Sequence, residues 1–301
     1  SSRWGFGWVR RSPGPPRPPL HIYTGGEHRL PGSATEGQGT DLLGLLSAKD
    51  DRYVANFSRG PYQGLAEMHD LVLDLGDVPD TKGLHLFLNG WIFPTDASIN
   101  VALSQSDKLQ LKRPSLEVIN TKGQWQEVLA DIGSPAGKDK TVVVNLEGKF
   151  PTADRRVRIS TNMEIYWDRV FFGQDEQVPV SLTEMNPHSA DHHYRGFSAM
   201  FHKGGNYGPH WFDYSTVSTT PRWLDLEGNY TRYGDVTELL QAADDMYIIA
   251  NAGDETTIRF DAGKLPPLKT GYTRDFLIYS VGWVKDGDLN TALGQTVEPL
   301  P

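Results

Sequence analysis

The sequence predicts a mainly β protein made of two related antiparallel β-sandwich domains of jelly-roll type, each with one short helix. The chain of 301 residues contains 31 glycines, 20 prolines, eight tryptophans and twelve tyrosines, a composition that favours short strands joined by turns. Apolar segments are separated by turn residues at the intervals typical of sandwiches. One pattern of residues also occurs twice, which predicts that a structural unit is repeated.

The internal repeat consists of two blocks in each copy. TDLLGLLSAKDDRYVANF at 40–57 matches DVTELLQAADDMYIIANA at 235–252. LHLFLNGWIFPTDASINVALSQ at 84–105 matches DFLIYSVGWVKDGDLNTALGQ at 275–295. The order and spacing of the shared residues agree closely, so the two copies are expected to have the same topology.

Each copy predicts a short helix followed by strands. The apolar face of the helix is formed by Leu42, Leu45 and Leu46 in the first copy and by Val236, Leu239 and Leu240 in the second. The predicted strands are 53–57, 71–75, 84–93, 141–146, 157–160 and 165–172, then 247–251, 257–260 and 276–284. Trp91 and Trp283 occupy equivalent positions in the repeat, so both are expected in a core.

Composition also predicts the domain boundaries. Residues 1–19 contain five prolines, which remove backbone donors and favour polyproline II, so they predict an arm. Residues 20–175 form the first predicted domain and 176–301 the second. The arm contains aromatic residues and arginines, the side chains that dominate interfaces, and a linker is the alternative interpretation. Its candidate contact residues are Trp4, Phe6, Trp8, Arg10 and Arg11.

Charge and cysteine content exclude several classes of function. The net charge of −9 argues against nucleic acid as a partner, since nucleic acid requires a basic surface. The absence of cysteine excludes disulfides, thiolate metal sites and a cysteine nucleophile. No apolar run approaches the roughly 20 residues that a membrane-spanning helix needs.

A repeated Asp/Asn pattern predicts a calcium site as one interpretation. The candidate ligands are Asp286, Asp288 and Asn290 in the second copy and Asp96, Ser98 and Asn100 in the first. The D-x-D-x-N spacing begins many calcium loops, because alternate side chains converge on one point. The glutamate that completes an EF-hand would fall at Val297. The alternative is that these side chains cap backbone groups in a turn.

Two further patterns suggest chemistry. The first is a histidine-rich stretch with His188, Asp191, His192, His193, His202 and His210. His188 and His192 would meet on a helix and hold a metal, but Pro187 favours loop histidines instead. The second is Glu164 and Asp168, which flank two aromatic residues as in a glycosidase pair and are otherwise ordinary strand acids.

Motifs for nucleophilic or zinc catalysis are absent: the sequence has neither G-x-S-x-G nor H-E-x-x-H. The chain is therefore not expected to be an enzyme. Tryptophans can stack on sugars, but the recurrence of Gly-Trp in both copies favours a role in the core.

Several aromatic and glycine-rich phrases resemble a known group of proteins. They include YRGFSAMF, YGPHWFDY, EGNYTRYGDV, DDMYIIANAGDE and GWVKDGDLN, and in the first half GPYQGLAEMHDLVLDLGD and ISTNMEIYWDRVFF. Residues 40–301 are similar to the C-terminal region of bacterial exported proteins with FG-GAP/VCBS repeats, which often carry ASPIC/UnbV and tetratricopeptide segments. The resemblance implies an exported protein in an adhesive or scaffold setting, and it supplies no catalytic residues.

These observations together predict a non-catalytic interaction or structural module at an extracellular, cell-surface or periplasmic location. We expect it to assemble with itself through the arm, as a homo-oligomer or filament, or to bind other surface proteins. A carbohydrate-binding or carbohydrate-active accessory domain is one alternative, and a periplasmic scaffold subunit of a larger complex is another. Apart from calcium at the Asp/Asn pattern, no cofactor is expected.

Overall fold

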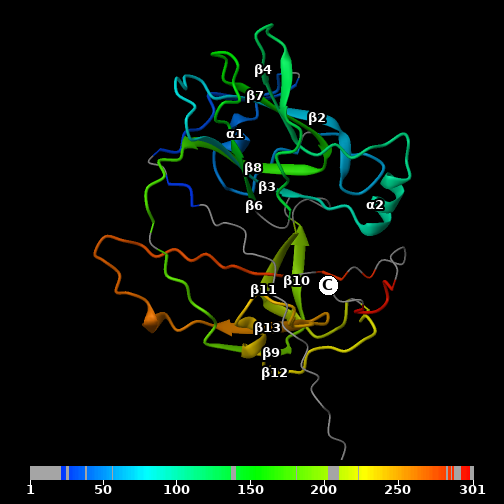
Figure 1. The fold of residues 1–301 in the computed structure, drawn as a ribbon. Helices are drawn as coiled ribbons and strands as arrows, with labels where there is room; N and C mark the ends of the chain where they lie inside the picture. The colour runs from blue at the N-terminus through cyan, green and yellow to red at the C-terminus, as the bar shows by residue number, and fades with distance from the viewer. Residues whose placement is uncertain are drawn as a thin grey trace, which may run out of the picture. The chain divides into compact units, whose positions relative to one another are not determined.

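The computed structural model describes residues 22–298, apart from 25–26, 38, 56, 137–139, 181, 203–209, 223, 283, 286 and 288–292. It confirms the mainly β class, with several antiparallel sheets and two short α-helices (Figure 1). The predicted arm lies outside the described residues. The described chain divides into an N-terminal unit, formed mainly by Ile22–Pro179, and a C-terminal unit, formed mainly by Val180–Phe201 and 212–298.

The N-terminal unit contains two antiparallel sheets. The larger has the order β1 (Ser33–Glu36), β2 (Leu65–Asp74), β7 (Arg156–Met163), β4 (Ser115–Ile119) and β5 (Trp125–Leu129). The smaller has the order β6 (Lys140–Asn145), β3 (Leu84–Ile92) and β8 (Ile165–Gln174). Leu71 on β2 lies opposite Ile159 on β7, and Leu86 on β3 lies between Val144 and Phe172. The predicted strands at 71–75, 84–93, 141–146, 157–160 and 165–172 are thus confirmed as elements.

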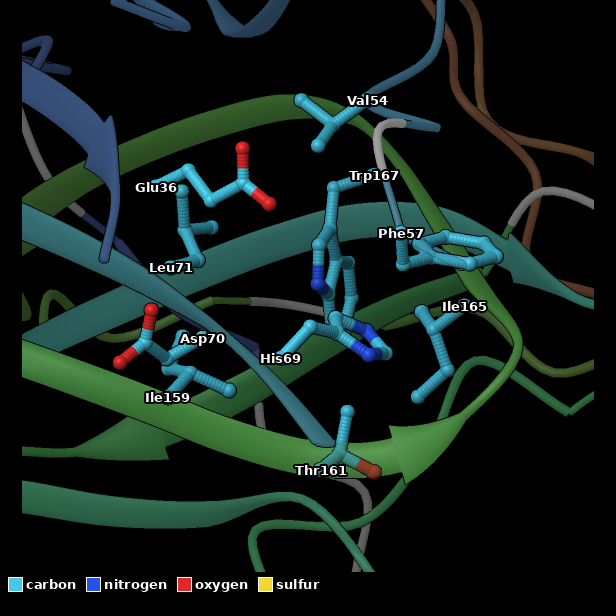
Figure 2. A pocket seen from close by; sticks show the side chains of 10 residues that line it. All are labelled: Glu36, Val54, Phe57, His69, Asp70, Leu71, Ile159, Thr161, Ile165 and Trp167. Carbon is cyan, nitrogen blue, oxygen red and sulfur yellow. The ribbon is translucent and has the colours of Figure 1, made fainter. Parts of the chain in front are cut away.

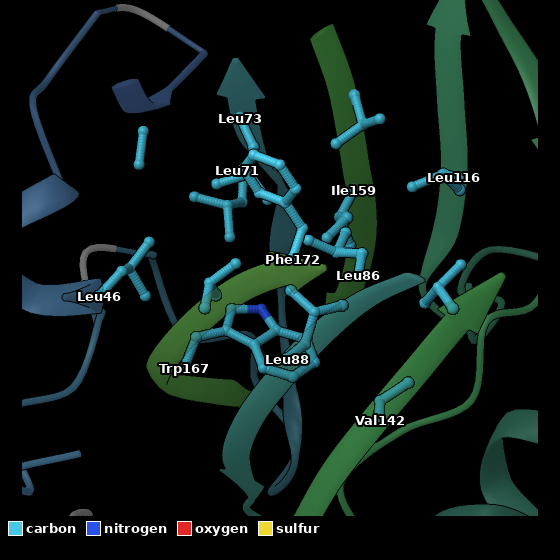
Figure 3. Packing of buried hydrophobic residues seen from close by; sticks show 14 of the residues in the cluster. Leu46, Leu71, Leu73, Leu86, Leu88, Leu116, Val142, Ile159, Trp167 and Phe172 are labelled. Carbon is cyan, nitrogen blue, oxygen red and sulfur yellow. The ribbon is translucent and has the colours of Figure 1, made fainter. Parts of the chain in front are cut away.

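A single hydrophobic cluster contains side chains from both sheets. Figure 3 shows Leu71, Leu73 and Ile159 of the larger sheet with Leu86 and Phe172 of the smaller one. Side chains alternate between the two faces of a strand, so every second residue of β3 enters this core. The other face of β3 carries Phe87, which stacks on Phe171 with ring centroids 4.7 Å apart.

Both α-helices lie in the N-terminal unit. The helix α1 (Leu43–Leu46) lies where a helix is predicted, and Leu46 is fully buried in the hydrophobic cluster. The helix α2 (Ala97–Ser104) falls in the segment that the Asp/Asn pattern assigned to a loop. Its N-cap is Asp96, which satisfies one of the free amide groups of the first turn.

The C-terminal unit has shorter elements. Its sheets are β12 (Gly234–Asp235), β9 (Ser189–Tyr194) and β13 (Asp254–Arg259) in that order, and β10 (Phe197–His202) with β11 (His210–Ser218). Two 3₁₀ turns complete it, η1 (Thr237–Leu240) and η2 (Ala262–Lys264). The second predicted helix is therefore the single turn η1.

The described residues do not show the predicted repeat. Residues 84–92 form β3, whereas residues 275–282 contain no strand. Residues 53–55 and 247–251 also lack a strand, and Val54 makes only an isolated bridge to Trp167. A strand forms only where neighbours accept its backbone hydrogen bonds. β3 lies between β6 and β8, whereas 275–282 has no neighbouring strand among the described residues.

No helix in the described part of the chain is long and apolar enough to cross a bilayer. Trp91, one of the two predicted core tryptophans, is buried at 6% exposure. Its predicted counterpart, Trp283, lies outside the described residues.

Candidate functional site

A small pocket in the N-terminal unit is the best-defined candidate for a ligand site. It has a volume of about 10 Å³, enough for about one water-sized group. Figure 2 shows the ten residues that line it: Glu36, Val54, Phe57, His69, Asp70, Leu71, Ile159, Thr161, Ile165 and Trp167. Strands β1, β2, β7 and β8 contribute most of them, so the pocket is built on rigid elements rather than on loops.

His69 provides the polar centre of this pocket. Its Nδ1 lies 3.0 Å from the carbonyl oxygen of Glu67. Because a carbonyl can only accept, Nδ1 is the donor, and Nε2 keeps its lone pair when the ring is neutral. Nε2 is buried and has no hydrogen-bond partner among the described residues. Burial lowers the pKa of His69 below its ordinary value of 6.5, and Phe57 stacks on the ring with centroids 4.7 Å apart.

Two carboxylates share the pocket with His69. In Figure 2 the carboxylate of Glu36 points toward the ring of Trp167. Asp70 Oδ2 lies 3.9 Å from Nη1 of Arg158, whose Nε also donates to Glu117 Oε2 at 2.6 Å. The pocket thus presents mainly acceptors, which suits one small donor such as a water molecule. No group of three or more acidic or histidine ligands with metal-binding geometry occurs among the described residues.

The two carboxylates of the predicted glycosidase pair, Glu164 and Asp168, each form hydrogen bonds with other groups of the protein. Arg59 Nε donates to Glu164 Oε1 at 3.0 Å, and Arg59 Nη2 donates to the hydroxyl of Tyr166 at 3.1 Å. The Tyr166 hydroxyl donates to the same Glu164 oxygen at 2.5 Å. Burial, and then the hydrogen bond to Glu164, raise the pKa of Tyr166 to about 12. Asp168 is fully buried and accepts from the backbone N–H of Asp50 at 3.2 Å.

The second of these acids, Asp168, lies at a β-bulge in β8. Trp167 lies opposite Gly90, but Arg169 lies opposite Asn89, so Asp168 is an extra residue in the ladder. The side chains of β8 that enter the core are therefore those of odd-numbered residues before the bulge, such as Trp167, and those of even-numbered residues after it, such as Val170. Gly90 permits the close approach of the two strands, since a Cβ there would lie 2.4 Å from the carbonyl oxygen of Tyr166.

The histidine-rich stretch was expected to lie in loops, but His192 and His193 lie within β9 and His202 and His210 lie at strand ends, so the prediction of loop histidines is corrected for these residues. His192, fully buried, points to one face of β9 and its Nδ1 lies 3.0 Å from Thr256 Oγ1. His193 points to the opposite face and pairs with Asp191 at 3.0 Å. Because neighbouring strand residues face opposite sides, these two histidines cannot share a metal. His188 precedes β9, His202 ends β10 and His210 begins β11.

The first Asp/Asn pattern makes the contacts expected of capping groups. Asp96 Oδ1 accepts from the backbone N–H of Ile99 at 2.7 Å, and Thr95 Oγ1 donates to Asn100 Oδ1 at 2.8 Å. Ser98 lies in the first turn of α2. The stronger candidate ligands, Asp286, Asp288 and Asn290, lie outside the described residues, so calcium binding stays a prediction there.

The predicted interaction residues Trp4, Phe6, Trp8, Arg10 and Arg11 also lie outside the described residues. Three of the described tryptophans have ring surfaces that are buried or covered. Trp91 and Trp167 are buried, and the guanidinium of Arg158 covers the ring of Trp125 at 4.8 Å.

The C-terminal unit contains the most exposed apolar segment among the described residues. Phe276, Leu277, Ile278 and Val284 are 69%, 68%, 82% and 84% exposed. This segment was predicted as a strand, and the sequence pattern alone gives no sign that it lacks neighbours. The pocket around His69 was also not predicted, because its residues come from distant strands that no short motif links.

Comparison with known proteins adds no assignment: no family model, no curated protein and no solved structure matches this chain.

Proposed function

We propose that the protein is a non-catalytic interaction module whose C-terminal unit provides an apolar surface for another polypeptide. The observation that carries this proposal is the distribution of apolar side chains. Among the described residues, the buried hydrophobic side chains of the C-terminal unit are Ala190, Val236 and Val297. All the others belong to the N-terminal unit, while most of the exposed large ones belong to the C-terminal unit. Exposed contiguous apolar surface marks interaction sites.

The small sheets of the C-terminal unit support the same proposal. A two-stranded sheet such as β10–β11 is marginal by itself in water. Met200, Phe201, Phe212 and Tyr214 on these strands are each at least 40% exposed. A partner polypeptide that covers these side chains would remove from water the apolar surface that the described residues leave exposed.

For the N-terminal unit, we propose a β-sandwich, because its two sheets contribute to one hydrophobic cluster. An exported location, from the resemblance noted above, belongs to the same proposal. The arm at residues 1–19 is a second candidate contact by composition: it is basic, whereas the chain as a whole carries a net charge of −9.

A fluorescent dye that binds exposed apolar surface tests the proposed function on the intact chain. We expect the native protein to bind the dye while it retains a cooperative thermal transition. The double variant Leu277→Ser, Ile278→Ser should bind less dye, whereas Met68→Ser, on the N-terminal unit, should bind as much as the wild type. A monomeric native chain without dye binding would contradict the proposal, since its apolar side chains would then be covered from within.

A further inference from the structure

We infer that two copies of this chain associate edge to edge through β13, which pairs with β13 of the second copy as antiparallel strands about a twofold axis at Thr257. The inference rests on the proposed function and names the partner of the C-terminal unit as a second copy. β13 is the last strand of the sheet β12–β9–β13, so one of its edges has no neighbouring strand among the described residues. An edge strand is a template for the strand of another chain.

The hydrogen bonds of β9 show which backbone groups of β13 face outward. The carbonyl oxygen of Ala190 accepts from Val236 N at 3.0 Å, so the backbone groups of Ala190 are directed to the β12 side. Ala190 lies opposite Ile258, and residues opposite each other in an antiparallel pair exchange either both hydrogen bonds or none. Ile258, and with it Thr256 two residues earlier, therefore directs its N–H and C=O away from β9. Within the part of the chain that the structure describes, these outward groups have no hydrogen-bond partner.

An axis at Thr257 brings the outward groups of the two copies together. Thr256 of one copy then lies opposite Ile258 of the other, and the symmetry makes this pair twice. Each of the two pairs exchanges two backbone hydrogen bonds. The side chain of Ile258 is 43% exposed, and its counterpart in the second copy is its diagonal neighbour across the axis. The pairing thus satisfies backbone groups and covers apolar surface at the same time.

The charges of β13 are complementary to themselves in this pairing. Glu255 of one copy lies opposite Arg259 of the other, and this ion pair also forms twice. Arg259 is exposed, and its guanidinium group has no partner among the described residues. Glu255 Oε2 lies 3.0 Å from Nε of Arg195 in its own chain. A carboxylate accepts several hydrogen bonds, so Glu255 retains acceptors for the second copy.

The same charges select the register. An axis between two residues would place an outward residue opposite one that faces β9, and the hydrogen bonds would be lost. An axis at Ile258 would place Glu255 opposite Asp261, and an axis at either charged residue would place like charges opposite each other. An axis at Thr256 would leave Glu255 opposite Thr257, with no ion pair. The axis at Thr257 is therefore the register that pairs opposite charges.

A proline on the outer edge gives the first test, because an outward N–H is not part of the ladder between β9 and β13. Ile258→Pro removes this donor, and proline is tolerated in edge strands whose N–H faces solvent. We expect the variant to retain a cooperative thermal transition and to sediment as a monomer. The matched control Ile258→Val keeps the N–H and should dimerise like the wild type. A proline variant that still dimerises would overturn the pairing.

A cysteine on the axis gives the second test, because the chain contains no cysteine of its own. In Thr257→Cys the two thiols lie directly opposite each other, so mild oxidation should produce a disulfide-linked dimer. The control Ser189→Cys lies on the same face of the sheet, one strand further from the axis. Its two thiols are at least three strand spacings apart, about 14 Å, and should remain unlinked on a non-reducing gel. Equal cross-linking of both variants, or of neither, would overturn the register.

A charge reversal gives the third test. Arg259→Glu places a carboxylate opposite Glu255 twice, and we expect it to weaken the dimer about tenfold in sedimentation analysis. Arg222→Glu changes the net charge by the same amount at an exposed residue outside β13, and should dimerise like the wild type. Equal weakening by both variants, or by neither, would overturn the ion pair across the axis.

The outcomes separate this inference from the proposed function. A monomeric chain that still binds the apolar dye would overturn self-association and leave the interaction surface in place. A monomeric chain without dye binding would overturn both. Deletion of residues 1–19 should leave this dimer intact, and loss of the dimer on deletion would assign the contact to the arm and overturn the pairing of β13.

Discussion

The two units of this protein use similar sequence patterns with different results. Residues 84–92 and 275–284 are both apolar, aromatic and of high strand propensity. The first forms β3, with hydrogen-bonded neighbours on both sides and Leu86 and Leu88 fully buried. The second is exposed along most of its described length. The difference shows that a sequence of high strand propensity is not sufficient to form a buried strand. Neighbouring strands are needed to accept its hydrogen bonds and to cover its apolar side chains.

The largest expected effect comes from the core of the N-terminal unit. Phe172→Ala removes a side chain that is 1% exposed and should lower the free energy of unfolding by about 3–5 kcal/mol. Phe276→Ala, the matched change in the exposed segment, should stay within about 0.5 kcal/mol in the monomer. Urea denaturation of both variants at low protein concentration measures the difference. Equal losses would show that the C-terminal segment is buried after all.

A second substitution concerns the buried carboxylate of Glu164. Arg59→Met removes its cationic partner, which should cost about 2–3 kcal/mol because a buried carboxylate loses a charge-assisted hydrogen bond. Arg113→Met breaks the exposed pair with Asp131 and should cost less than about 1 kcal/mol. Chemical denaturation of the two variants gives the comparison, and similar small losses would mean that Glu164 has other sufficient partners.

The bulge in β8 makes Gly90 a sensitive position. Gly90→Ala places a Cβ against the carbonyl oxygen of Tyr166 and should destabilise the N-terminal unit by about 1–3 kcal/mol. Gly44→Ala in α1 meets no atom within 4 Å and should be neutral or stabilising, since alanine favours a helix. Melting temperatures of the two variants test this, and a neutral Gly90→Ala would contradict the close strand approach.

A smaller effect is expected at the helix cap of α2. Asp96→Ala should cost about 1 kcal/mol, because the N–H of Ile99 loses its acceptor. Melting temperatures with calcium and with a chelator distinguish capping from metal binding at this site. If capping is the only role, the loss is the same in both solutions. A loss that appears only with calcium would assign Asp96 to a metal site.

The smallest effect concerns His69. Burial lowers its pKa in the folded chain, so between that value and about 6.5 the unfolded chain binds more protons. The stability associated with the neutral ring is present above about pH 6.5 and is lost as the pH falls through the folded-state pKa. We therefore expect the difference in the free energy of unfolding between the wild type and His69→Gln, measured from pH 7.5 to pH 5, to become smaller as the pH falls. Parallel curves would contradict this.

Little of the candidate sites was accessible to sequence reasoning. The Asp/Asn spacing identified Asp96 as a capping or ligand residue, because local hydrogen bonds depend only on near neighbours. The pocket combines Glu36 on β1, His69 on β2 and Trp167 on β8, which are brought together only by sheet order. The carboxylates Glu164 and Asp168 were singled out together, but a bulge and the distant Arg59 gave them separate structural partners.

By itself, the sequence determined the mainly β class, the helix at Leu43–Leu46 and the strands whose apolar residues alternate or run together, such as β3 and β8. These features depend on local propensity and periodicity. Only the tertiary structure decided that 84–92 enters a sheet while 275–282 does not, and that β8 carries a bulge opposite Gly90. Both depend on backbone partners far away in the chain, and a strand has no means within its own residues to satisfy its hydrogen bonds.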